Sequence, residues 1–114
     1  MVSTTLKDLL NESCQSLPKD SACLSDSEAN RLLTLVPDWI ISTDGKSISR
    51  NYKFKNYYET MSFLNVAAWI AHQEDHHPDI HLSYNHCLIT YSTHSVGGLS
   101  RNDFICAAKT DKLR

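Results

Sequence analysis

Two stretches of alternating apolar and polar residues lie on either side of one long helical stretch, and this arrangement restricts the fold more than any other feature. In the first stretch, Trp39-Ile40-Ile41 starts a strand and Asp44-Gly45 is typical of a hairpin turn. The return strand alternates apart from Arg50, and its apolar side is formed by Ile48, Tyr52 and Phe54. The sequence therefore predicts a hairpin over about residues 39–54.

The second stretch, which follows Pro78, predicts another hairpin. One strand alternates through Ile80, Leu82 and Tyr84, and the turn falls at Tyr84-Asn85 or Asn85-His86. The return strand alternates through Cys87, Ile89, Tyr91 and Thr93. Gly97-Gly98 ends it.

Three helices are predicted around these hairpins. Ser25 with Glu28 forms a capping box before an apolar periodic run that Pro37 ends. Asn56 with Glu59 opens a longer helix over 57–74, and Ser100 with Asp103 opens the last one. The order α-β-β-α-β-β-α predicts an α+β two-layer sandwich, in which a four-stranded antiparallel sheet carries three helices on one face.

The helix over 57–74 has two apolar rows, so both sides need a partner. One row can face the sheet, and the other would be exposed in a monomer. We therefore expect a homodimer or homotetramer that assembles through this helix. The rows are Met61, Leu64, Ala68 and Ala71, and Phe63, Val66 and Ile70.

The chain has 114 residues, which fits one domain. We expect residues 25–114 to form it and residues 1–24 to be a polar, loosely attached leader. Leu6, Leu9 and Leu10 are spaced for a short helical turn within that leader.

Charge and cysteine usage exclude several classes of protein. A net charge of -2 argues against a nucleic-acid partner. No apolar run approaches the roughly 20 residues that cross a membrane, and the N-terminus lacks a signal-peptide pattern. The four cysteines form no C-x-x-C pair, so we expect free thiols and a cytoplasmic location.

Histidine is the residue that stands out, with six in so short a chain. His72 and His76 share a helical face at i, i+4 and could form a zinc site. However, Glu74 does not directly follow His72, as the H-E-x-x-H signature requires, and no cysteine spacing supports a metal. We therefore predict no metal, and keep a metal-binding module as a rival function.

The remaining histidines divide into surface and site candidates. His81 and His86 sit at polar positions beside a turn, which favours a surface role. In His76-His77-Pro78, the proline makes a rigid helix exit that would hold both rings in fixed, divergent directions. Asp103 caps the last helix, joins the site, or does both.

The chain reads His72-x-x-x-His76-His77-Pro78, then Tyr84, His94 and Asp103 at fixed spacings. This full pattern resembles the pterin-4a-carbinolamine dehydratase family. The ending Gly98-Leu-Ser-Arg-Asn-Asp-Phe-Ile-Cys-Ala-Ala-Lys-Thr-Asp111 is similar to the bacterial branch, and Pro37-Asp38-Trp39 also matches. The likeness covers about residues 25–112. His72 stands where the family usually has Glu.

The resemblance implies a lyase without a cofactor: a 4a-hydroxytetrahydrobiopterin dehydratase that forms quinonoid dihydropterin and water. It would recycle the pterin of aromatic amino-acid hydroxylases, as in phenylalanine hydroxylation. Imidazole, with a pKa of about 6.5, suits both proton transfers. His76, His77 and His94 match the catalytic histidines, and Asp103 would orient His94.

The resemblance also implies a pterin pocket and leaves room for other functions. Its lining would include Asp75, His76, His77 and Pro78, together with Ser92, Thr93, His94 and Ser95. Ser95 departs from the acidic residue of animal members, and His72 would modulate the site. Animal members also serve as dimerisation cofactors of a homeodomain transcription factor. A non-catalytic pterin-binding or protein-interaction module is therefore the alternative to an enzyme.

Overall fold

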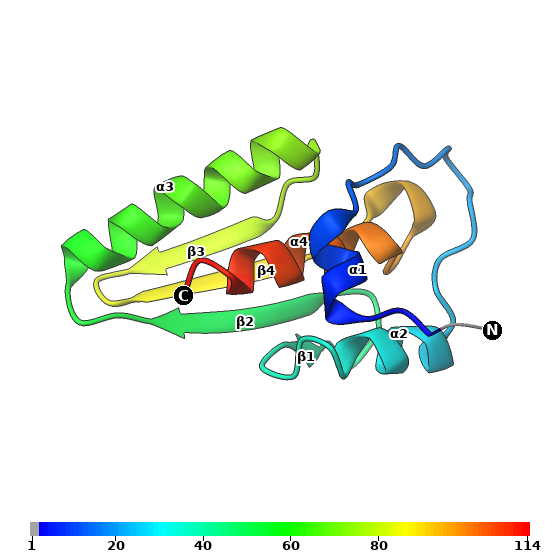
Figure 1. Cartoon of the computed structure of the whole chain (residues 1–114), viewed down its shortest axis with the longest axis horizontal. Coiled ribbons are helices and arrows are strands. Elements are labelled where there is room, and N and C mark those ends of the chain that lie inside the picture. The colour runs from blue at the N-terminus through cyan, green and yellow to red at the C-terminus, as the bar shows by residue number, and fades with distance from the viewer. Residues whose placement is uncertain (1–2) are drawn as a thin grey trace.

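The computed structural model describes residues 3–114, and its centre is one antiparallel sheet in the strand order β1-β2-β4-β3 (Figure 1). Each hairpin contributes two neighbouring strands, and β2 pairs with β4 in the middle, where Arg50 lies opposite Ile89. This arrangement confirms the predicted α+β fold with a four-stranded antiparallel sheet. The strands are β1 (Ile40–Ile41), β2 (Ile48–Lys53), β3 (Asp79–Ser83) and β4 (His86–Tyr91).

Within residues 3–114, four α-helices and one short 3-10 helix accompany the sheet. The α-helices are α1 (Leu6–Asn11), α2 (Asp26–Leu33), α3 (Tyr57–Glu74) and α4 (Arg101–Asp111), and η1 (His94–Val96) is the 3-10 helix. The capping residues act as predicted: Asn56 Oδ1 accepts from the Glu59 N–H, and Ser25 Oγ accepts from the Glu28 N–H. The short turn predicted in the leader is α1, so the structure has one helix more than the three of the predicted order.

The core lies on one face of the sheet, between the strands and the helices. The inward positions of β2 and β4 are buried apart from Arg50, which is half-buried, whereas outward neighbours such as Asn51 and Leu88 are exposed. Period-two alternation produces this difference, because successive side chains point to opposite faces. The buried inward residues are Ile48, Tyr52, Cys87, Ile89 and Tyr91.

The buried face of α3 differs from the two predicted apolar rows. It consists of Thr60, Phe63, Ala67 and Ala71, which takes one residue from each row and adds two others. Thr60 is fully buried because its hydroxyl donates to the Tyr84 carbonyl at the β3–β4 turn and to the Asn56 carbonyl. The two-row assignment was therefore wrong in detail. An apolar outer face nevertheless remains, with Tyr58 85% and Trp69 58% exposed.

The leader packs against α4, where a loosely attached segment was expected. Leu9 of α1 is completely buried in the core. Glu12 forms a bidentate ion pair with Arg101, with both N–O distances 2.7 Å. These anchors join residues about 90 positions apart, so periodicity within the leader gives no sign of them.

One carboxylate at the end of α4 explains why Arg50 occupies an apolar position of β2. Asp111 Oδ1 accepts from Trp39 Nε1 and from Arg50 Nη1, each at 2.8 Å, and also from the Tyr52 hydroxyl. Burial and the Asp111 carboxylate raise the pKa of Tyr52, so this phenol remains a donor. The cluster joins the start of β1, the middle of β2 and the end of α4.

We expect Asp111→Ala to lower the free energy of unfolding by about 2–3 kcal/mol, because it strands three donors that no longer find a buried acceptor. Asp38→Ala is the matched control, since Asp38 is an exposed partner of Arg50 at 3.5 Å and should contribute about 0–1 kcal/mol. Denaturant unfolding of both variants measures the difference. Equal losses from the two substitutions would contradict a structural role for the Asp111 cluster.

Candidate functional site

The site begins at the end of α3, where the chain turns through a left-handed residue. Asp75 has φ +50° and ends the helix, and the N–H of His76 donates to the Ala71 carbonyl at 3.1 Å. Aspartate tolerates this backbone region better than most residues, because its short polar side chain can bond locally. The turn brings His76 back toward α4.

His76 is fixed by a buried carboxylate. Its Nε2 lies 2.6 Å from Asp103 Oδ1, and Asp103 is completely buried. The other oxygen, Oδ2, accepts from the Thr93 hydroxyl at 2.8 Å and from the Ser100 N–H at 2.9 Å. The imidazole also stacks on Tyr91, with ring centroids 5.5 Å apart and planes 12° apart. The ring is therefore held both in its plane and at one nitrogen.

This pairing sets the tautomer of His76. A carboxylate only accepts hydrogen bonds, so Nε2 carries the proton and Nδ1 has a free lone pair when the ring is neutral. Within residues 3–114, Nδ1 of His76 has no hydrogen-bond partner. The carboxylate thus fixes the Nε2 side of the ring, and the opposite nitrogen, Nδ1, is available to a ligand.

The partner of Asp103 corrects one expectation from the sequence. The carboxylate orients His76, and not His94, which lies exposed on η1. It also caps α4 through the Ser100 N–H, so the same carboxylate caps the helix and bonds His76. The left-handed turn at Asp75 determines which histidine pairs with Asp103, because it brings His76 next to this carboxylate, 27 positions further along the chain.

A cavity of about 370 Å³ lies beside His76, within the size range of small-molecule sites. Of the predicted site residues, it gathers Asp75, His76, Thr93 and Ser95, with Asp103 behind them. Its lining does not include His77, Pro78, Ser92 or His94, although His77, Ser92 and His94 each adjoin a residue that does line it. His77 and His94 are exposed, and both Pro78 and Ser92 are half-buried.

The other histidines lie away from this cavity. The ring of His72 is exposed and lies 5.8 Å from the indole of Trp69. His81 is exposed on the open face of the sheet, and His86 bonds Asn51 there at 3.0 Å, as their polar positions predicted. No three His, Cys, Asp or Glu side chains in the part of the chain that the structure describes are arranged to hold a metal ion.

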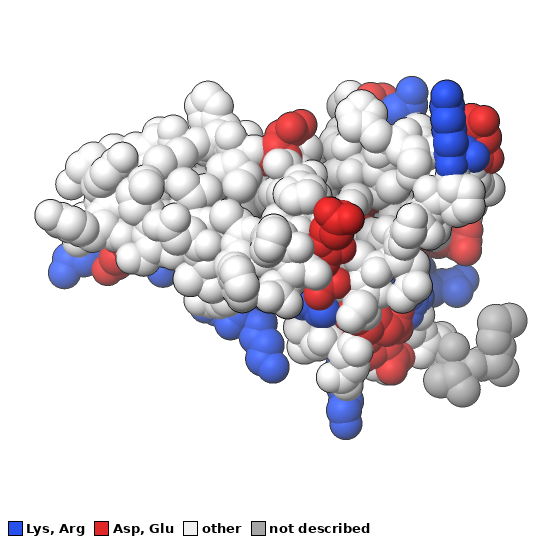
Figure 2. All heavy atoms as spheres, turned by 90° about the horizontal axis from the view of Figure 1, so that it is seen from above, with Lys and Arg blue, Asp and Glu red and all other residues white. Residues whose placement is uncertain are grey.

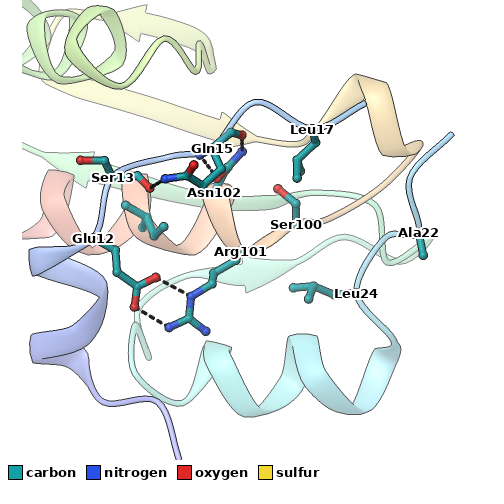
Figure 3. Close-up of a pocket in the computed structure, with 10 residues that line it drawn as sticks. Glu12, Ser13, Gln15, Leu17, Ala22, Leu24, Ser100, Arg101 and Asn102 are labelled. Atoms are coloured by element: carbon teal, nitrogen blue, oxygen red, sulfur yellow. Dashed lines mark hydrogen bonds and ion pairs between the residues drawn. The ribbon is translucent and has the colours of Figure 1, made fainter. Parts of the chain in front are cut away.

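Several cavity residues were not expected from the sequence, because they come from the leader and from two polar positions beside predicted residues. The Gln15 N–H donates to Asn102 Oδ1 at 2.9 Å, and Asn102 Nδ2 donates to the Gln15 carbonyl at 2.7 Å (Figure 3). A polar leader gives no periodic signal of such contacts. The unexpected lining residues are Cys14, Gln15, Ser16, Leu17, Glu74 and Asn102.

Two titratable groups at the rim have defined states. Burial raises the pKa of Glu74, but hydrogen bonds from Lys109 and from the Cys14 N–H outweigh it and leave the pKa below its usual value. A hydrogen bond with Cys106 and burial raise the pKa of the Cys14 thiol. Glu74 is therefore an anion at neutral pH, and Cys14 is a neutral thiol rather than a nucleophilic thiolate.

No helix among residues 3–114 has the length and apolar character needed to span a bilayer.

The arrangement at His76 can move protons, because it holds an imidazole with one bonded and one free nitrogen at the wall of a cavity.

Comparison with known proteins identifies the family. Residues 22–113 match the family model described as pterin 4 alpha carbinolamine dehydratase. A candidate pterin-4-alpha-carbinolamine dehydratase of Nitrosospira multiformis is 48% identical over 110 residues, which is 96% of each chain. A relative of the same description from Stenotrophomonas maltophilia is 52% identical over 90 residues, or 79% of this chain and 78% of the relative.

Two solved structures share the fold. The crystal structure of a transcriptional coactivator/pterin dehydratase from Brucella melitensis has a TM-score of 0.77 and 32% identity, and covers 80% of this chain and 97% of its own. A pterin dehydratase-like RuBisCO assembly factor of the alpha-carboxysome has a TM-score of 0.58 and 22% identity over 67% of this chain and 88% of its own, a likeness of fold alone. The family match and these relatives show that the chain belongs to the pterin-4a-carbinolamine dehydratase family.

Proposed function

We propose that the protein is a cytoplasmic 4a-hydroxytetrahydropterin dehydratase that recycles the pterin of an aromatic amino-acid hydroxylase. The observation that supports it most strongly is the His76 imidazole, held by buried Asp103 at the wall of a 370 Å³ cavity in a member of this family. The substrate would be 4a-hydroxytetrahydrobiopterin or a related pterin. The products would be quinonoid dihydropterin and water.

The reaction needs two proton transfers and nothing else. The C4a–O bond breaks as the departing hydroxyl gains a proton and leaves as water. The adjacent N5–H loses its proton, and its electrons form the C4a=N5 double bond. A histidine with one free nitrogen can accept a proton, and a protonated one can donate, both near neutral pH.

We assign the roles to the three histidines that match the family pattern, His76, His77 and His94. His77 would hold or protonate the 4a-hydroxyl, and His76 with His94 would carry the remaining proton transfers. His76 is the one whose orientation the fold sets, through Asp103. His72, which lies outside the cavity lining, would modulate substrate binding. The pterin itself would contact Asp75, Pro78, Ser92, Thr93 and Ser95 in addition to the three histidines.

Replacement of both His76 and His77 by Ala should reduce the acceleration of dehydration to near the uncatalysed rate, because both proposed proton carriers are lost. Stopped-flow ultraviolet spectroscopy measures this as the decay of 4a-hydroxytetrahydropterin made in situ by a phenylalanine hydroxylase. His81→Ala is the control, since His81 lies on the open face of the sheet. Near-normal turnover by the double variant would refute histidine catalysis.

Asp103→Asn should lower kcat by about 10-fold or more, within the range of general acid–base contributions. An amide nitrogen placed at Nε2 of His76 would donate a hydrogen bond, which forces the imidazole proton onto Nδ1 and removes its free lone pair. Nitrogen-15 NMR of the His76 ring reports that change of tautomer directly. The hypothesis fails if the tautomer switches and kcat stays unchanged.

The alternative function, a non-catalytic pterin-binding or protein-interaction module, has one structural observation in its favour. The outer face of α3 is apolar, and Figure 2 shows few Lys, Arg, Asp or Glu atoms over this part of the surface. Among relatives, one solved structure is described as a coactivator and another as an assembly factor. The same face of α3 would serve self-association into a dimer or tetramer, and we favour this role over binding of another protein.

Substitution of Val66 and Trp69 by Lys should therefore reduce the oligomeric state, because it places two charges on the apolar outer face of α3. Val66 is 45% exposed and Trp69 is 58% exposed. Analytical ultracentrifugation at several concentrations measures the mass. Ile40→Lys is the matched control, as Ile40 is 69% exposed but lies on β1. A wild-type mass for the α3 double variant, or an equal loss in the control, would exclude α3 as the specific contact.

A further inference from the structure

A segment of the leader crosses the His76 cavity and is fastened at both ends. We call residues 14–20 the strap. At one end, the Cys14 N–H donates to Glu74 Oε1 at 2.7 Å, and Gln15 exchanges two hydrogen bonds with Asn102. At the other end, the Asp20 N–H donates to the Ser95 carbonyl at 3.1 Å. The strap therefore joins the end of α3 to η1, the two segments that also line the cavity.

The strap supplies four of the ten residues that line this cavity, and one of them differs in character from all the rest. Leu17 is the only aliphatic side chain in a lining that otherwise consists of Cys14, Gln15, Ser16, Glu74, Asp75, His76, Thr93, Ser95 and Asn102. Figure 3 shows Leu17 on the strap in a close-up of a second pocket, which Leu17, Gln15 and Asn102 also line. Apolar contact on this side of the cavity thus depends on one residue.

The chemistry of a pterin makes that residue important. A pterin is a flat bicycle with hydrogen-bonding groups around its edge and with faces that gain from leaving water. The polar lining residues can satisfy the edge. Only Leu17 among them can cover a ring face with an aliphatic surface.

The strap lies outside the part of the chain that the family model matches. The family model starts at residue 22, after the strap. The Brucella structure matches over 97% of its own length but only 80% of this chain, whereas the Nitrosospira relative aligns over 96% of this chain. A contact made by the strap would therefore distinguish chains with such a leader from those with the core alone.

We propose that the strap is a wall of the pterin site in this protein and that Leu17 determines how tightly the pterin ring is held. This inference rests on the proposed function, because it assigns the ligand of the same cavity. The Leu17 side chain has no group that forms hydrogen bonds or transfers a proton. Its contact with the pterin ring would therefore stabilise the bound substrate and the transition state equally. Loss of such uniform binding raises KM and leaves kcat unchanged.

The test compares Leu17→Ala with two matched variants of the full-length chain. Leu17→Met keeps an apolar side chain of similar volume at the cavity. Leu6→Ala makes the same truncation on the leader, at a residue of α1 that does not line the cavity. The two readouts are KM and kcat from the stopped-flow assay, and the Kd of 7,8-dihydrobiopterin, a pterin with no 4a-hydroxyl to lose, from fluorescence quenching.

We expect Leu17→Ala to raise both KM and Kd about three- to tenfold with kcat kept, on the scale of a partly buried leucine side chain. Leu17→Met and Leu6→Ala should remain within about twofold of the wild type. Thermal melting of each variant shows that the leader is still packed.

Two results would overturn the inference while the proposed function stands: wild-type KM and Kd in a folded Leu17→Ala, or an equal rise of KM in Leu6→Ala. A fall in kcat at constant Kd would also overturn it, because it would show that Leu17 acts on chemistry through the shape of the fold. A wild-type protein that neither binds 7,8-dihydrobiopterin nor accelerates dehydration refutes the proposed function itself.

Discussion

The Asp103 carboxylate is the group on which the architecture of the site depends. It is completely buried, and such a group is tolerated only when its oxygens are occupied by donors. The three donors are His76, Thr93 and the Ser100 N–H, which belong to the end of α3, the segment after β4 and the start of α4. The requirement to satisfy one buried carboxylate therefore brings together three segments, and the orientation of the His76 ring follows from it.

Much of the fold could be predicted from the sequence, because its signals are local. These signals depend on residues close together in the sequence: the alternation in both hairpins, the capping residue Asn56 and the periodicity that sets the length of α3. The structure contains both hairpins, the Asn56 cap and a helix of the predicted length. The buried face of α3 was wrong in detail. Thr60 is polar and reads as an outward residue, yet the Tyr84 carbonyl at a distant turn gives its hydroxyl a partner in the core.

The candidate site was predictable only in part, for the same physical reason. The family resemblance assigned His76, Thr93 and Asp103 to one site, and the structure joins these three residues by hydrogen bonds. The pairing within the cluster depends on the left-handed turn at Asp75, which a sequence pattern does not reveal. The contribution of the strap depends on Asn102, whose amide bonds both backbone groups of Gln15 across 87 positions.

Helix α4 links the stability of the fold to the chemistry of the site. It carries a carboxylate at each end, Asp103 and Asp111, eight residues and about 12 Å apart along the helix axis. Asp111 collects Trp39, Arg50 and Tyr52 and so fixes the helix to β1 and β2, far from the cavity. Since α4 is attached to the sheet at that end, Asp103 cannot shift without moving a buried helix. The position of His76 is thus fixed by packing outside the cavity, and the proton-transfer role that we propose for this residue requires such an orientation before substrate arrives.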